Sequence, residues 1–260
     1  MARSIVFIHG AWLTPASWDK FQSRFAAHGY EVDAPPWPFE DMPLAALRRS
    51  PPAALDHVGV AEIADHYEKI IRAKPEPPVI LGHSFGGLFA QIMLDRGLGT
   101  AGVALDPAPI KGVMPGLDAV IGALPVFLRW NGWKTVHTMS FQSFFTRFAN
   151  GLSEADARAA YERYVAPTPG KLYFDALLNR GNAVDPARRK VPLLLTLGGK
   201  DRTVTPASVR HSYALQKKSP AITALKAFPD RSHFLASMPG WEEVADVALA
   251  WLENPKAGEL

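Results

Sequence analysis

Short apolar runs alternate along the chain with longer segments in which apolar residues recur at helical spacing. The short runs have the length and β-branched content of buried strands, and they predict strands at residues 4–8, 31–33, 78–81, 101–105, 191–197 and 222–228. The longer segments place their apolar residues on one helical face, and they predict helices at residues 15–28, 60–71, 85–94 and 241–252. Strands and helices that alternate in this way are typical of βαβ units. We therefore predict an α/β fold with a mostly parallel central sheet flanked by helices.

The stretch from Pro107 to Lys190 departs from this alternation. It is rich in aromatic residues and has no clear strand. We interpret it as a helical insertion between two strands of the sheet. The predicted domain organisation is therefore a core of residues 1–106 and 191–260, with residues 107–190 as a helical cap.

Composition and charge exclude several classes of protein. The 260 residues contain no cysteine, which excludes a disulfide scaffold, a thiolate metal site and a cysteine nucleophile. The net charge is +3, and no long basic stripe with interleaved aromatic residues suggests nucleic-acid binding. No apolar run approaches the roughly 20 residues of a membrane helix, and the apolar part of the first ten residues is too short for a signal peptide. We expect a soluble, cytoplasmic protein with no insertion into membranes.

The sharpest chemical signal is the segment Gly82-His83-Ser84-Phe85-Gly86, a G-x-S-x-G pattern. It follows the predicted strand 78–81 and opens the predicted helix 85–94, which is the context that this motif requires. The flanking glycines are needed because side chains there would collide with the neighbouring backbone. A hydroxyl at this helix N-terminus lies where amide N–H groups and the helix dipole favour developing negative charge. The pattern therefore predicts Ser84 as a catalytic nucleophile.

A serine hydroxyl needs a base to take its proton, and in this arrangement an acid and then a histidine follow the serine along the chain. Asp201 and His233 come shortly after the last two predicted strands. Both therefore lie beyond the carboxyl ends of parallel strands, where open α/β sheets bind ligands. We predict His233 as the base and Asp201 as the carboxylate that orients it.

Other ionisable side chains near these motifs have simpler interpretations. His83 adjoins the serine and cannot easily reach back to it, so we expect it to pack or to form a local hydrogen bond. His9 is expected to brace the turn after the first strand, and Asp230 to shape the turn before His233. His137 lies in the insertion, where a structural role is expected.

These segments together resemble the α/β-hydrolase fold superfamily, in its esterase and hydroxynitrile-lyase-like branch. The resemblance covers essentially the whole chain and rests on the turn His9-Gly10-Ala11-Trp12, the serine turn at Ser84, and the loops of Asp201 and His233. It implies an α/β-hydrolase fold in which the helical cap is inserted before the acid-bearing strand.

The resemblance also implies roles for particular residues. The residue after the His-Gly pair and the residue after the nucleophile donate backbone N–H groups to the oxyanion in this superfamily, and here these are Ala11 and Phe85. The proton shuttle corresponds to His233 and its orienting carboxylate to Asp201. Some members carry the acid at the position of Asp106 instead.

The substrate pocket is expected to be apolar. Its candidate walls are aromatic residues of the cap and of the turn after the first strand: Trp12, Phe127, Trp130, Phe141 and Phe145. Cations in the cap could anchor a charged substrate: Arg129, Lys134 and Arg147. A water-poor site of this kind suits an uncharged and fairly apolar molecule.

We therefore predict a serine hydrolase that cleaves a small-molecule carboxylic ester or lactone through an acyl-enzyme, without a cofactor or a metal ion. The sequence carries no H-E-x-x-H motif, phosphate-binding loop or dinucleotide fingerprint. Two other classes stay open. One is a non-hydrolytic enzyme of the same fold, of the hydroxynitrile lyase or cofactor-free perhydrolase type, and the other is a slow-turnover ligand-binding receptor. The sequence does not indicate an oligomeric state.

Overall fold

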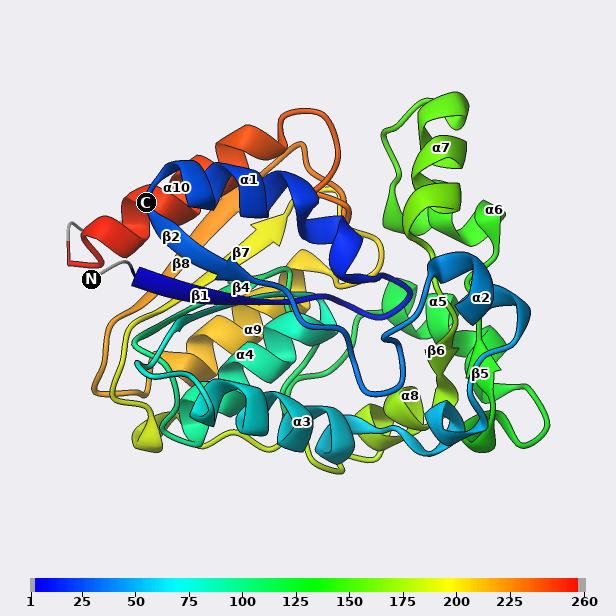
Figure 1. The fold of residues 1–260 in the computed structure, drawn as a ribbon, viewed down its shortest axis with the longest axis horizontal. Coiled ribbons are helices and arrows are strands. Elements are labelled where there is room, and N and C mark those ends of the chain that lie inside the picture. The colour runs from blue at the N-terminus through cyan, green and yellow to red at the C-terminus, as the bar shows by residue number, and fades with distance from the viewer. Residues whose placement is uncertain (1–2, 257–260) are drawn as a thin grey trace.

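The computed structural model describes residues 3–256, and these form a central sheet with helices on both faces (Figure 1). The sheet has six strands in the order β2-β1-β3-β4-β7-β8, and every neighbouring pair is parallel. The strands are β1 (Arg3–Ile8), β2 (Tyr30–Asp33), β3 (Val79–His83), β4 (Ala101–Leu105), β7 (Leu193–Gly198) and β8 (Thr223–Phe228). The predicted α/β fold class and parallel sheet are therefore confirmed.

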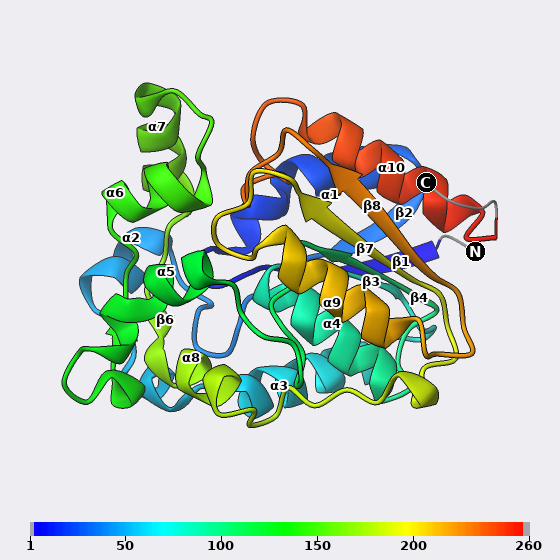
Figure 2. The same cartoon turned by 180° about the vertical axis from the view of Figure 1, so that it is seen from behind.

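Helices cover the two faces of the sheet, as Figures 1 and 2 show from opposite sides. One face carries α1 (Asp19–Ala27) and α10 (Trp241–Glu253), and the other carries α3 (Val60–Arg72), α4 (Phe85–Asp95) and α9 (Pro206–Gln216). Alternate residues of β1 pack against the two helical layers, because successive side chains of a strand point to opposite faces of the sheet. Ile5 and Phe7 belong to the core cluster that contains the α1 and α10 residues, whereas Val6 and Ile8 belong to the cluster that contains the α3 and α4 residues.

The strand order changes direction at β1. This strand pairs with β2 at the edge of the sheet and with β3 on its other side, so the chain first runs out to the edge and then returns past β1 to β3. Loops that follow two such strands diverge, and open α/β sheets bind their ligands at this point beyond the carboxyl ends of the strands. The loop after β1 begins at His9, and the turn after β3 contains Ser84.

The segment between β4 and β7 contributes no strand to the central sheet, and it lies largely beyond the carboxyl ends of the strands (Figure 1). It contains α5 (Leu117–Phe127), α6 (Phe141–Ser143), α7 (Glu154–Tyr164) and α8 (Gly170–Leu177). Two-residue strands β5 (Val136–His137) and β6 (Thr168–Pro169) form a short antiparallel ladder within it. This ladder is too short to leave a periodic signal in the sequence. A further helix that the apolar pattern did not predict, α2 (Leu44–Arg49), follows the proline-rich loop after β2.

No helix within residues 3–256 has the length and apolar character needed to cross a membrane.

Candidate active site

Ser84 occupies a strained turn between β3 and α4. Its backbone angles are φ 56° and ψ −121°, and a positive φ is unfavourable for a residue with a side chain. Steric contacts explain why glycine is needed at positions 82 and 86. A Cβ on Gly82 would lie 2.0 Å from the carbonyl oxygen of Gly86, and one on Gly86 would lie 1.9 Å from that of Ile8. The sequence Gly-x-Ser-x-Gly is thus what allows β3 to turn so sharply into α4 beside β1.

The turn after β1 lies directly against Ser84. A Cβ on Gly10 would come within 2.8 Å of the Ser84 Cβ, so only a glycine allows this approach. In this turn the Leu13 N–H donates to the Gly10 carbonyl and the Trp12 N–H donates to Thr168 Oγ1 at 2.6 Å. The Ala11 N–H, in contrast, donates to no backbone carbonyl of residues 3–256.

The second backbone N–H without a carbonyl acceptor lies at the start of α4, the helix that follows Ser84. Phe85 is the first residue of α4, and its N–H likewise has no carbonyl acceptor in the described part of the chain. Such orphan donors at a helix N-terminus attract negative charge. Ala11 and Phe85, the residues for which the sequence resemblance implies an oxyanion-hole role, therefore each have a backbone N–H without a carbonyl acceptor among the described residues.

Asp201 and His233 form a fully buried pair. His233 Nδ1 donates to Asp201 Oδ2 at 2.6 Å, and both side chains have an exposed fraction of 0%. The other oxygen of Asp201, Oδ1, accepts the N–H groups of Thr203 and Val204 at 2.7 and 2.8 Å. Because burial disfavours the imidazolium, it lowers the pKa of His233 to about 3. The imidazole is therefore neutral near pH 7, as a general base must be.

The second ring nitrogen of His233, Nε2, is buried and has no hydrogen-bond partner within residues 3–256. It is therefore not bonded to the Ser84 hydroxyl in this structure. The residue before Ser84 nevertheless holds the histidine loop in place. His83 Nε2 donates to the His233 carbonyl at 2.8 Å, and the two rings lie 4.6 Å apart. This is the local hydrogen-bonding role expected for His83.

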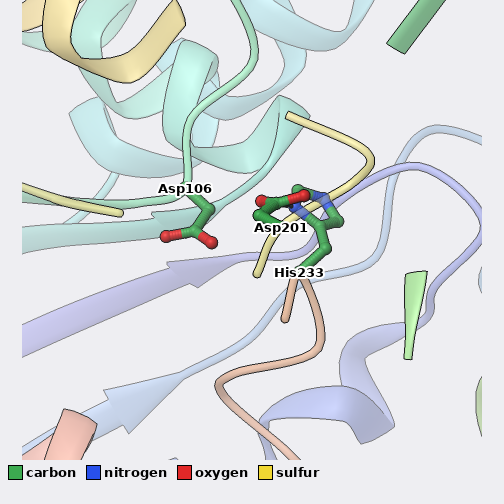
Figure 3. Close-up of side chains that lie close together, drawn as sticks. All are labelled: Asp106, Asp201 and His233. Carbon is green, nitrogen blue, oxygen red and sulfur yellow. Dashed lines mark hydrogen bonds and ion pairs between the residues drawn. The ribbon is translucent and has the colours of Figure 1, made fainter. Parts of the chain in front are cut away.

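A second carboxyl group lies beside the pair. Figure 3 shows Asp106, at the end of β4, close to Asp201 and His233, which come from the loops after β7 and β8. One polar atom from each of the three side chains lies within 4.8 Å of the other two. Asp106 Oδ1 accepts the Thr196 hydroxyl at 3.2 Å, and Oδ2 accepts the Gly198 N–H at 3.1 Å.

Asp106, Asp201 and His233 are also the candidate ligands for a metal ion. No other group of three His, Asp or Glu side chains converges in this way in the part of the chain that the structure describes. The carboxylate oxygens, however, already accept N–H and O–H groups, and His233 Nδ1 donates toward Asp201 rather than presenting a lone pair. These partners fit hydrogen-bonded carboxyl groups and do not fit metal ligands.

The sequence matches the family described as "Alpha/beta hydrolase family" over residues 5–247. The chain belongs to this family. A search of curated protein sequences found no significant match.

Solved structures of similar fold include several esterases and lipases. This alpha/beta hydrolase is 22% identical to a monoacylglycerol lipase from Paleococcus ferrophilus, with a TM-score of 0.72, and the match covers 96% of this chain and 93% of that chain. The methylesterase MES16 from Arabidopsis is 16% identical, with a TM-score of 0.70 and coverage of 96% and 99%. Polyneuridine aldehyde esterase is also 16% identical, with a TM-score of 0.67 and coverage of 96% and 99%. At these identities the likeness establishes the shared fold.

A second buried pair, His9 and Glu40, supports the turn of this hydrolase that contains Ala11. His9 Nδ1 donates to the Gly10 carbonyl at 3.0 Å, and its ring stacks on Trp37 at 4.8 Å. Its Nε2 lies 3.5 Å from Glu40 Oε2, and both side chains are 1% exposed. Burial lowers the pKa of His9 to about 4 and raises the pKa of Glu40 well above its usual range. His9 was expected in this bracing position, whereas Glu40 was not predicted, since an acid in a proline-rich loop gives no sign of burial.

The predicted pocket residues occupy different positions. Trp12 lies at the site: its indole Nε1 donates to the His137 carbonyl at 3.2 Å, and its ring packs on Tyr173 at 4.9 Å. Phe127, Phe141 and Phe145 pack on rings of the same 107–190 segment. Trp130 is 86% exposed and faces solvent rather than a pocket.

Two aromatic residues that were not predicted to line the pocket pack against Phe85 and His233. Tyr173 packs edge-on against Phe85 at 5.2 Å, as well as on Trp12. Phe148 packs edge-on against the ring of His233 at 4.8 Å. Phe148 belongs to the aromatic run of the segment, but nothing in that run distinguishes it from its neighbours, and Tyr173 carries no motif. His137 Nε2 donates to the Gly132 carbonyl at 3.2 Å, which is a structural role.

Proposed function

We propose that this alpha/beta hydrolase cleaves carboxylic esters or lactones of small, fairly apolar molecules, with Ser84 as the nucleophile. The observation that carries the proposal is the state of His233. Its Nδ1 is fixed by Asp201 at 2.6 Å, and its buried Nε2 lacks a partner, which is the arrangement of a neutral base waiting for a proton. The strained turn at Ser84 supports the same assignment.

The proposed reaction proceeds through an acyl-enzyme. The Ser84 hydroxyl attacks the carbonyl carbon while His233 Nε2 takes its proton, and the charge on the tetrahedral oxygen is stabilised by the N–H groups of Ala11 and Phe85. Removal of one such donor typically costs about 2.7–4 kcal/mol in the barrier. His233 then protonates the leaving alcohol. A water molecule repeats the sequence on the acyl-enzyme and releases the acid.

Asp201 keeps the imidazole in the tautomer that has its lone pair on Nε2. It also stabilises the imidazolium that forms during each half of the reaction. Because both side chains are buried, this interaction is little screened by solvent.

We further propose that residues 107–190 form a cap over a core of residues 1–106 and 191–260, of which residues 1–2 and 257–260 lie outside the described part. An apolar pocket is supported by the ring of Tyr173, which packs on Trp12 and Phe85, and by the ring of Phe148, which packs on His233. Phe127, Phe141 and Phe145 serve as internal packing of the segment.

A substrate screen tests this function. Esters of graded acyl length, lactones and amides are assayed with the wild-type protein and with Ser84→Ala, whose fold is checked by circular dichroism. Hydrolysis by the wild type alone supports the proposal, and equal hydrolysis by Ser84→Ala contradicts it. Cyanide release from cyanohydrins would identify a lyase, and perhydrolysis in the presence of hydrogen peroxide would identify a perhydrolase. A ligand-induced thermal shift without turnover of any compound would identify a receptor.

A further inference from the structure

Asp106 is a buried ionisable group that the proposed reaction does not use. It directly follows β4, its side chain is fully buried, and its backbone φ is +43°. Left-handed backbone geometry costs energy in any residue other than glycine, although aspartate tolerates it better than most. Its N–H donates to the Thr196 carbonyl at 3.2 Å, which ties the strained residue to β7. Strain of this kind is typical of functional sites and persists only where the surroundings fix it.

Asp106 and Asp201 are buried and have carboxyl oxygens within 4.8 Å of each other. Two carboxyl groups this close and out of water cannot both be ionised, so one of them holds a proton. The hydrogen bonds decide which one. Asp201 accepts three N–H groups at 2.6 to 2.8 Å, including the one from His233, and this number of short bonds favours the carboxylate. Asp106 accepts only two bonds, both longer than 3.0 Å, and no N–H of a charged group is among them. The proton therefore belongs on Asp106.

We propose that Asp106 is a positioning residue that remains a neutral carboxylic acid at neutral pH and donates a hydrogen bond to Asp201, which keeps Asp201 ionised and aligned with His233. This inference deepens the proposed function, on which its kinetic part depends. The consequence for the molecule is a chain of three side chains in which only the last one, His233, exchanges a proton with the substrate.

Within residues 3–256, no lysine or arginine forms an ion pair with either carboxyl group. The ionisable group beside the two carboxyl groups is His233. The ring of His83 lies next to that of His233, and its pKa is lowered well below its usual range by burial and by the repulsion that two charged imidazoles would experience. Charged side chains of the adjoining loops and of the 107–190 segment form ion pairs elsewhere: Lys200 with Asp230, Arg202 and Arg147 with Asp118, and Arg231 with Glu243. Asp201 therefore relies on neutral donors.

The titration of the two groups agrees with this assignment. Burial and the charge of Asp201 raise the pKa of Asp106 well above its usual range. Burial also raises the pKa of Asp201, whereas the proposed hydrogen bond from Asp106 and the N–H groups of Thr203 and Val204 lower it. Without that bond Asp201 would take up a proton at a still higher pH. We therefore expect the kcat/KM of the wild type to rise with pH through a midpoint near that of Asp201.

The kinetic test compares two replacements of similar size. Asp106→Asn retains an N–H donor toward Asp201, whereas Asp106→Leu has none. We expect Asp106→Leu to move the acid midpoint of the kcat/KM profile up by about one pH unit or more, with the activity recovering toward a plateau at high pH. Asp106→Asn should keep the wild-type midpoint. A purely structural role would instead lower the activity of Asp106→Leu equally at every pH.

A matched control comes from another buried carboxyl group. Asp175, on α8, is 6% exposed and accepts its bonds from Lys171 and from the Val60 N–H, outside the Asp201 and His233 cluster. Asp175→Asn should leave the acid midpoint in place whatever it does to stability. An unchanged midpoint in folded Asp106→Leu would overturn the proposal.

A second measurement needs neither turnover nor the leucine variant. The full-length chain is labelled with ¹³C at the aspartate carboxyl carbons, and the Asp106 resonance is identified by its loss in Asp106→Asn. At pH 7 we expect the chemical shift of a protonated carboxylic acid, and the shift of a carboxylate would overturn the proposal. If the wild type hydrolyses no ester, the proposed function fails, and this spectrum still decides the state of Asp106.

Discussion

His233 Nδ1 donates to Asp201 Oδ2 at 2.6 Å, and neither side chain is exposed to solvent. The direction of this bond determines the chemistry of the ring, because it places the only N–H proton of a neutral imidazole on Nδ1. Nε2 then carries a lone pair in a buried position without a partner. The alpha/beta hydrolase fold supplies the rest of the arrangement, since the loops after β3, β7 and β8 bring Ser84, Asp201 and His233 to the same end of the sheet.

Replacement of the orienting carboxylate should reduce activity severely. In Asp201→Asn the amide N–H would face Nδ1 and favour the tautomer that has its proton on Nε2, which cannot accept the serine proton. We expect kcat for ester hydrolysis to fall by roughly 10³- to 10⁴-fold with the fold retained. Asp230→Asn is the control, because Asp230 is exposed and pairs with Lys200. Near-normal activity in Asp201→Asn, combined with a loss in Asp106→Asn, would show that Asp106 is the acid.

Thr168 should control the oxyanion turn from the 107–190 segment. Its hydroxyl oxygen accepts the buried Trp12 N–H at 2.6 Å, next to the free Ala11 N–H. Thr168→Val preserves the shape and removes the acceptor, so the free energy of unfolding should fall by about 1–3 kcal/mol. A displaced Ala11 donor should lower kcat by about 10- to 100-fold with little change in KM.

Denaturant titration and steady-state kinetics on the same preparations measure both effects. Thr146→Val provides the comparison, since the Thr146 hydroxyl donates to the Gln142 carbonyl on the exposed surface. It should change stability by no more than about 0.5 kcal/mol. If Thr168→Val matched Thr146→Val in both measurements, Thr168 would have no part in holding the turn.

Glu40 should make the stability of the protein depend on pH. Burial raises the pKa of Glu40 well above 4.5 in the folded state, so unfolding releases its proton at any pH between its unfolded and folded values. The stability that Glu40 contributes is complete below pH 4.5 and is lost as the pH rises toward its folded pKa. In this range its loss amounts to about 1.4 kcal/mol per pH unit.

Glu40→Gln removes this titration while keeping a similar shape. The free energy of unfolding of the variant, relative to that of the wild type, should therefore increase as the pH rises from 5 to 7. Urea unfolding at three pH values in this interval measures the difference. Parallel curves for the two proteins would mean that Glu40 is ionised in the folded state.

The fold was largely predictable because its central strands β1, β3, β4 and β7 are short apolar runs that are buried over most of their length, whereas the edge strands β2 and β8 are only partly buried. Ser84 was recognisable because Gly82 is required by its contact with the backbone of Gly86, and Gly86 by its contact with the backbone of Ile8 in β1, and this requirement leaves a fixed spacing in the sequence. The loop positions of Asp201 and His233 follow from the strand order. Their catalytic roles, and those of Ala11 and Phe85, stay predictions.

Other features of the site depend on burial, which a local sequence pattern does not express. Glu40 lies in a proline-rich loop and Asp106 ends a strand, and both positions would suit a solvated acid. Only the folded chain brings His9 beside Glu40, and Asp201 beside Asp106. The same limit applies to Tyr173, which comes from α8 and meets Phe85 at the start of α4 only in the folded chain.

The central claim is that Ser84 is a nucleophile activated by His233. The most direct measurement is labelling with a fluorophosphonate, followed by mass spectrometry of the digested protein. We predict a single phosphonylated peptide that contains Ser84 in the wild type, and no phosphonylation at Ser84 in a folded His233→Gln variant. Labelling of another residue with Ser84 unmodified, or equal labelling of Ser84 in His233→Gln, would contradict the account.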